Sequence, residues 1–213
     1  IGLSRSHEAT GKWREAVATV EHALERRPDD GDLLARRAEL AFAQGQLEQA
    51  RDFSKQAIAG NPNQLLARWI EAQAADAVGD HDAGRQGYEW FVHFYNRNET
   101  KDPESLWIIG QAAAEHAART LRGRDQSEQL GAVLNGMFDA AAEADKDFWP
   151  ATFSSGRLFL EKYKKGDALN DLRRALAINP NAAPVHVALG VAALNDYDIQ
   201  EGHQHADRAL ANN

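Results

Sequence analysis

The sequence has no cysteine and a single methionine among its 213 residues. Without thiols, the chain can form no disulfide, no thiolate nucleophile and no cysteine-ligated zinc site. No apolar run reaches the roughly 18 residues that a membrane span requires; the longest is about Val187 to Leu194. We therefore expect no membrane span and no thiol chemistry, while the cellular compartment is left open.

Sequence motifs of catalysis and metal binding are also missing. The chain has no H-E-x-x-H, no phosphate-binding P-loop, no G-x-G-x-x-G and no G-x-S-x-G. His203 and His205 are the closest histidine pair, but residues two apart on a helix point about 200° apart and cannot share one ion. The acidic run from Glu143 to Asp147 lacks the glycine and the closing glutamate of a calcium loop. We predict that the chain is not an enzyme and holds no cofactor or metal.

Positive charge is in short supply. Lysine and arginine number 24 against 32 aspartate and glutamate residues, which gives a formal net charge of −8. Because a nucleic-acid binder needs a basic surface to neutralise phosphates, we expect no nucleic-acid partner. Hydrophobic residues make up 43% of the chain, so a packed structure is expected rather than disorder.

Residues 31–64 show what the chain does have: two short amphipathic helices joined by a tight turn. Small and apolar residues recur at helical spacing on both sides of Gly45. Gly45 lies where a residue without a Cβ can adopt the positive φ of a helix stop. Pro62 ends the second helix, because it has no N–H to continue it. Since one such hairpin cannot bury its apolar face alone, we expect neighbours of the same kind.

Copies of this pattern recur along the chain. At an offset of 34 residues, Ala16, Val20, Ala23 and Pro28 match Ala50, Ser54, Ala57 and Pro62. Further copies are Gly79, Gly84, Tyr88 and Phe91; then Gly156, Ala168, Leu172, Ala175 and Pro180; and last Leu189, Gly190, Gly202, Ala206 and Ala209. A period of about 34 with small residues at the helix crossings resembles the tetratricopeptide repeat family. The pairs Leu189-Gly190 and Gly79-Asp80, with Ala50, Tyr88, Ala57 and Pro62, each fill one position of that family's pattern, although no single repeat fills them all.

The resemblance implies an all-α fold, a right-handed superhelical array of antiparallel helix hairpins. We expect one solenoid over residues 1–213 with about six repeats, the first truncated and the fourth enlarged. The repeats are approximately 1–30, 31–64, 65–98, 103–148, 149–182 and 183–213. Both ends fall inside a repeat and no initiator methionine is present, so we expect the chain to be a fragment of a larger protein.

The third and fourth repeats depart from the regular pattern. Residues 88–95 carry five aromatic side chains within two turns, which should push the next repeat away. We predict an N-cap at Asp102, a long helix from Pro103 to Leu121 that covers these aromatics, a turn at 123–126, and a helix over 127–144. For the last repeat, Asn195 and Asp196 are expected at the turn.

Two helix positions four residues apart hold an aromatic and then a polar side chain in several repeats. The pairs are Trp69 with Gln73, Trp107 with Gln111, and Phe153 with Arg157, and Glu39 holds the second position in repeat two. The family resemblance implies that both positions face the concave groove and bind a partner. The alternative is that both tryptophans pack as core between adjacent repeats. The groove interpretation requires Trp69 and Trp107 to be partly exposed.

The most economical function is a protein- or peptide-binding scaffold that uses its concave face. The second-position residues Arg5, Glu39, Gln73 and Gln111 do not match the lysine and asparagines with which related arrays grip a C-terminal carboxylate. A second interpretation is a non-catalytic accessory region of a larger enzyme, whose catalytic domain lies outside this sequence. A third is self-association through the ends of the array or the aromatic block.

Overall fold

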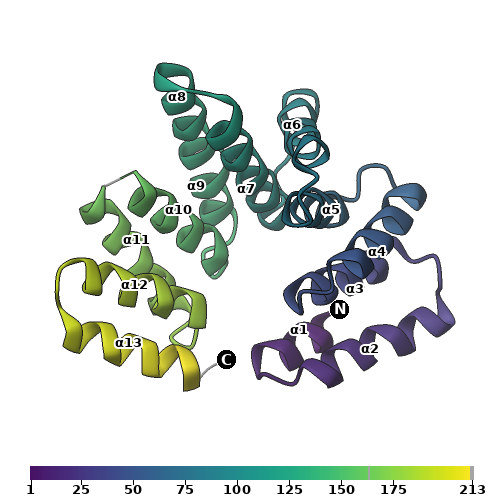
Figure 1. The fold of residues 1–213 in the computed structure, drawn as a ribbon, viewed down its shortest axis with the longest axis horizontal. Coiled ribbons are helices and arrows are strands. Elements are labelled where there is room, and N and C mark those ends of the chain that lie inside the picture. The colour runs from purple at the N-terminus through teal and green to yellow at the C-terminus, as the bar shows by residue number, and fades with distance from the viewer. Residues whose placement is uncertain (163, 212–213) are drawn as a thin grey trace. The chain divides into compact units, whose positions relative to one another are not determined.

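The computed structural model describes residues 1–162 and 164–211, and over these residues the chain is helical without any strand (Figure 1). This confirms the predicted all-α class. The elements are α1 (Gly2–Ala9), α2 (Trp13–Arg26), α3 (Gly31–Ala43), α4 (Leu47–Gly60), α5 (Leu65–Ala77), α6 (His81–Arg97), α7 (Pro103–Thr120), α8 (Gly123–Val133), the π-helical turn η1 (Leu134–Phe138), α9 (Asp139–Ala144), α10 (Trp149–Glu161), α11 (Lys165–Ile178), α12 (Ala183–Asn195) and α13 (Ile199–Ala211). None of these helices combines the length and the apolar character needed to span a bilayer.

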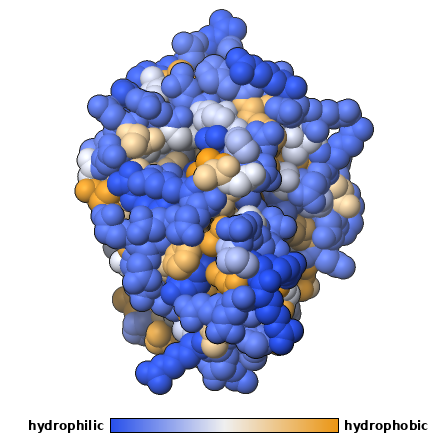
Figure 2. Space-filling model, turned by 90° about the vertical axis from the view of Figure 1, so that its right-hand side faces the viewer, coloured by the Kyte–Doolittle hydropathy of each residue, from blue (hydrophilic) through white to orange (hydrophobic). Residues whose placement is uncertain are grey.

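The helices form two compact units. Unit 1 contains Ile1–Glu99 and Ala112–Gln129, and unit 2 contains Thr100–Gln111 and Leu130–Asn213. Helices α7 and α8 contribute residues to both. The division of the chain into six repeats stays a prediction, and its last boundary, at Asn213, lies outside the described residues. One face of the molecule is mostly hydrophilic, with hydrophobic residues in small separate patches (Figure 2).

Local sequence signals explain where the hairpins begin and turn. Asp30 caps α3, because its Oδ1 accepts hydrogen bonds from the backbone N–H groups of Asp32 and Leu33, each 3.1 Å away. Gly45 ends the α3 turn at φ +72° and Gly79 ends the α5 turn at φ +90°. Both values lie in the left-handed region that only glycine enters without strain, which confirms the prediction for Gly45.

Small residues sit where the two helices of a hairpin cross. A Cβ on Gly87 would lie 2.7 Å from the Cβ of Ala72, and a Cβ on Gly156 would lie 3.0 Å from the Cγ of Leu172. Ala50 and Ala168, which stand at the equivalent crossings, are completely buried, as predicted. The short distances leave no room for a larger side chain, so these positions set how closely each pair of helices packs.

The enlarged fourth hairpin differs from its prediction. Asp102 caps α7 as expected, since its Oδ2 accepts from the N–H of Ser105 at 2.8 Å. The predicted turn at 123–126 is wrong: Gly123, at φ +57°, already begins α8. The second helix then passes through η1, and a Cβ on Gly110 would lie 2.6 Å from the ring of Phe138 in this turn. The wider π-helical turn thus brings a large ring against the smallest residue of α7.

The aromatic block on α6 is covered only in part. Tyr88 and Phe91 are buried, and the Arg119 guanidinium of α7 lies 4.9 Å from the centre of the Tyr88 ring. Trp90 remains half-buried, stacked on Phe94 at 4.9 Å. The lengthened α7 therefore reaches the Tyr88 side of the block, while Trp90 and Phe94 keep some contact with solvent.

The turn of the last hairpin also differs from its prediction. The residue with positive φ is Tyr197, at 63°, and neither Asn195 nor Asp196 adopts such a conformation. Asn195 is the last residue of α12, and Asp196 has a φ of −94° as its C-cap. The left-handed position therefore falls on a residue with a large side chain, which costs more there than glycine or asparagine would.

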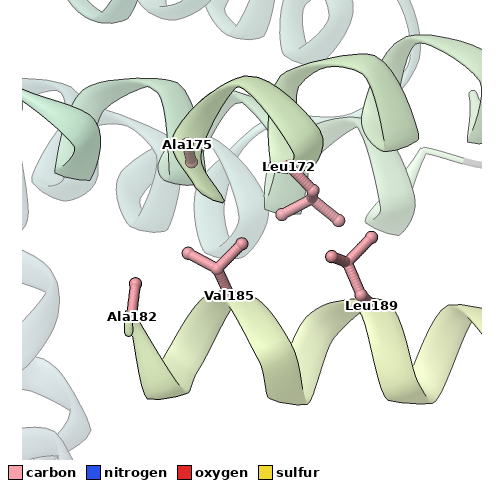
Figure 3. Packing of buried hydrophobic residues seen from close by; sticks show 5 residues of the cluster. All are labelled: Leu172, Ala175, Ala182, Val185 and Leu189. Atoms are coloured by element: carbon pink, nitrogen blue, oxygen red, sulfur yellow. The ribbon is translucent and has the colours of Figure 1, made fainter. Parts of the chain in front are cut away.

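In unit 2, α11 and α12 pack through a cluster of aliphatic residues (Figure 3). The cluster consists of Leu172, Ala175, Ala182, Val185 and Leu189, all buried. Half-buried side chains pack against its border, among them Phe153 and Leu160 of α10 and Leu176 of α11. Each hairpin of this unit thus completes its core only against its neighbour.

Two buried histidines join α12 to α13. The Nδ1 atoms of His186 and His205 lie 2.9 Å apart, and Nε2 of His186 lies 2.9 Å from the carbonyl oxygen of Pro180. Because only an N–H can bond to that carbonyl, Nε2 of His186 carries the proton, and its Nδ1 accepts from Nδ1–H of His205. Burial, and then the adjacent His186, lowers the pKa of His205, despite Glu201 nearby.

Replacing Ala168 by leucine tests the crossing of α10 and α11. The added side chain has no space beside Gly156, so the free energy of unfolding should fall by about 1–3 kcal/mol. Ala177→Leu on the exposed face of the same helix is the matched control and should be nearly neutral. Urea denaturation followed by circular dichroism measures both. Equal stability of Ala168→Leu and wild type would show that the crossing is misassigned.

The histidine pair should make stability depend on pH. Because the pKa of His205 is lowered in the fold, the unfolded chain binds more protons, and stability is lost as the pH falls through about 6.5. The free energy of unfolding should therefore drop more in wild type than in His205→Gln when the pH is lowered from about 7.5 to about 5.5. His203→Gln, an exposed neighbour on α13, should retain the wild-type slope. Parallel slopes for all three proteins would refute the assignment.

Candidate binding surface

In unit 1, the first of the predicted groove aromatics is part of the core. Trp69 is only 7% exposed, and its ring lies 5.7 Å from that of Tyr88, centre to centre. Trp69 therefore lacks the exposure that the groove interpretation requires, and its packing follows the core interpretation. Gln73, one turn further along α5, is half-buried.

Glu39, the predicted polar residue of the preceding hairpin, belongs to an ion cluster between α1 and α3. Arg36 is 1% exposed and donates to Glu39 at 2.5 Å, to Glu8 at 2.6 Å and to the Ser4 hydroxyl at 3.2 Å. Burial raises the pKa of Glu39, even though the Arg36 charge acts in the opposite direction. Since Arg36 would otherwise be buried and unpaired, the first duty of Glu39 is to balance that charge.

In unit 2, Trp107 is half-buried and held in one orientation. Its Nε1–H donates to the hydroxyl of Ser154 on α10 at 2.9 Å, and its ring meets that of Phe148 edge-on at 6.1 Å. Gln111, one turn further along α7, is also half-buried. The indole nitrogen is satisfied within the protein, so the part of the ring that reaches solvent is apolar.

The next pair, on α10, divides between core and surface. Phe153 lies 6.1 Å from the Trp149 ring and packs against the α11–α12 cluster, so it is half-buried between neighbouring hairpins. Arg157 is exposed, and its Nε lies 3.8 Å from a carboxylate oxygen of Glu161. Within unit 2, Trp107, Gln111 and Arg157 are thus the predicted residues that remain reachable.

A polar pocket of about 400 Å³ in unit 1 was not predicted. It is lined by Asp76, His81, Asp82, Arg85 and Arg119. Asp76 holds it together, with His81 Nδ1 and Arg119 Nη2 each 2.6 Å from its carboxylate. Burial alone would raise the pKa of Asp76, but these two hydrogen bonds outweigh it and lower the pKa.

The position of Asp76 alone hinted at this pocket, because it lies three residues after Gln73 on the same helix face. Arg119 belongs to the extended part of α7, where the repeat pattern gives no register. The exposed donors of His81 and Arg85 can reach a carbonyl or carboxylate of a partner. Within the described part of the chain, no three histidine or carboxylate side chains come together in a way that could hold a metal ion.

Comparison with known proteins supports the family from sequence and the fold from structure. Residues 7–75 match the sequence model of the tetratricopeptide repeat family. No curated protein matches the chain. Among solved structures, TTC0263, a thermophilic tetratricopeptide repeat protein of Thermus thermophilus, has a TM-score of 0.66 at 16% identity, covering 85% of this chain and 91% of that one.

Two further solved structures share the helical-hairpin fold. PilW, a type IV pilus biogenesis factor, has a TM-score of 0.57 at 16% identity and covers 99% of this chain and 90% of that one. A human IFIT1 dimer with m7Gppp-AAAA has a TM-score of 0.63 at 16% identity, covering 98% of this chain, which spans 48% of that one. At such identities the likeness shows the fold alone. The chain is a tetratricopeptide repeat protein, with the family's sequence pattern over residues 7–75 and the family's fold over most of its length.

Proposed function

We propose that this chain is a scaffold that binds a polypeptide segment, with Trp107 on α7 as the apolar anchor in unit 2. Tetratricopeptide repeats are in general a fold of protein interaction, and the finer assignment rests on the half-buried ring of Trp107. Its bond to Ser154 fixes the indole before any partner arrives, so little side-chain freedom is lost on binding. Aromatic side chains of this kind are typical anchors of interfaces.

Polar groups beside the anchor supply the rest of the proposed site. Gln111 lies one turn after Trp107 on α7, and its amide can pair with the backbone of a bound segment. Arg157 offers a guanidinium whose contact with Glu161 is long, at 3.8 Å, and exposed to solvent. Such a surface ion pair is weak and can be exchanged for a partner's carboxylate at small cost. Trp69 and Glu39 are left out of this site, because both are engaged within unit 1.

We also retain the predictions that the chain is not catalytic and does not bind nucleic acid. The net charge of −8 disfavours phosphate-rich partners. The second interpretation, an accessory region of a larger enzyme, stays a prediction that no contact in the described part of the chain favours.

Selection of peptides on the whole chain tests the proposed anchor. Peptides isolated from a random displayed library should bind Trp107→Ala at least about 30-fold more weakly, because truncating an anchoring aromatic costs about 2 kcal/mol or more. Trp13→Ala, a half-buried tryptophan on α2 in unit 1, is the control and should leave their affinity unchanged. Isothermal titration calorimetry on folded variants measures both.

The same variants separate anchor from core. Trp69→Ala should lower the free energy of unfolding by about 3–5 kcal/mol, as expected for a buried ring, whereas Trp107→Ala should cost less. If the selected peptides bind Trp107→Ala as tightly as wild type, the anchor does not lie on α7 and the proposed site is wrong.

A further inference from the structure

The outward side of the α12–α13 hairpin carries aliphatic side chains that face solvent. Val187, Val191 and Leu194 are 54%, 51% and 49% exposed, and Leu210 of α13 is 75% exposed. The first three are spaced four and three residues apart, so they share one face of α12. We call these four residues the α12–α13 outer face.

Inside unit 2, the residues at the same repeat positions are covered by the following helix. Phe153, Leu160 and Leu176 precede Val187, Leu194 and Leu210 by 34 residues each. All three pack against the cluster that joins α11 to α12 (Figure 3). The inner hairpin therefore shows what fits on such a face: a helix that presents Ala182, Val185 and Leu189 to it.

Unit 1 repeats this arrangement independently. Leu24 of α2 and Ile58 of α4, which are 34 residues apart, hold the position of Leu210 on their own hairpins. Both are half-buried against clusters to which the following helices contribute, with Leu33 or Leu34 beside Leu24 and Ala67 beside Ile58. A helix thus follows and covers this position wherever the structure describes one.

The outer face is also more apolar than its inner counterparts. Val191 holds the position that Gln73 and Arg157 occupy in other hairpins. A hairpin that ends an array in contact with water needs a polar outer side, and here a polar position has become aliphatic. The composition of this face suits contact with protein better than contact with solvent.

We propose that the α12–α13 outer face is a docking surface for an amphipathic helix of a partner polypeptide, which packs on α12 and α13 as α12 packs on α10 and α11. The partner helix presents small and branched aliphatic residues at the spacing of Ala182, Val185 and Leu189. The contact continues the interface that already joins successive hairpins. It does not depend on the proposed anchor at Trp107, since Leu210 and Val187 belong to the last hairpin alone.

A tethered helix tests this docking without knowledge of the natural partner. Residues 180–197 are fused after Asn213, where the 34-residue period places Pro180 in register. The tether raises the effective concentration to about the millimolar range, so weak docking still gives a signal. The matched control extension carries aspartate in place of the copied Val185 and Leu189.

The docked extension should slow amide hydrogen exchange in α12 and α13 by about tenfold or more relative to the control extension. Val187→Asp with Leu210→Asp in the parent chain should abolish this protection. Ile199→Asp, which changes an exposed aliphatic residue outside the face, should not. Trp107→Ala should also preserve it, which separates this proposal from the proposed function.

Two results overturn the proposal. One is equal exchange in the chains with the intact and the control extension. The other is concentration-dependent dimerisation of the unextended chain, seen by analytical ultracentrifugation and removed by Val187→Asp with Leu210→Asp, because a second copy would then occupy the face.

Discussion

The close approach of the two helices within each hairpin is the constraint on which the other contacts depend. At Gly87 and Gly156, the backbone of one helix comes so near its partner that a single added carbon would collide with Ala72 or Leu172. At Gly110 the same closeness is filled from the other side by the ring of Phe138. Because helix length and side-chain size are fixed at these crossings, the remaining faces of each hairpin are directed toward its neighbours and toward solvent.

The second level of packing, between hairpins, decides which conspicuous side chains are core and which are reachable. Trp69 and Trp107 stand at the same repeat position, yet Trp69 is buried beside Tyr88 and Trp107 is half-buried beside Ser154. The position alone does not determine exposure; the size of its neighbours does. Val187, at the same position on α12, has no helix of the described chain upon it and is exposed.

Sequence periodicity predicted most of the fold because its signals are local. The positive φ of Gly45 and the cap at Asp102 follow from their own neighbours in sequence. Contacts such as Asp76 with Arg119 and His186 with His205 were not predicted, since each joins residues on different helices at a separation that the 34-residue period does not specify. The π-helical turn and the left-handed Tyr197 also follow from packing. For the candidate site, the sequence identified the right positions but could not separate Trp107 from Trp69.

The central claim of this account is that each hairpin is stabilised chiefly by the hairpins beside it. Hydrogen exchange of the intact chain, measured helix by helix in increasing denaturant, tests it most directly. The account predicts that α12–α13 opens at lower denaturant than α10–α11, and α1–α2 at lower denaturant than α3–α4, because end hairpins have one neighbour and inner ones two. Exchange of all these helices at one common free energy of opening would contradict it.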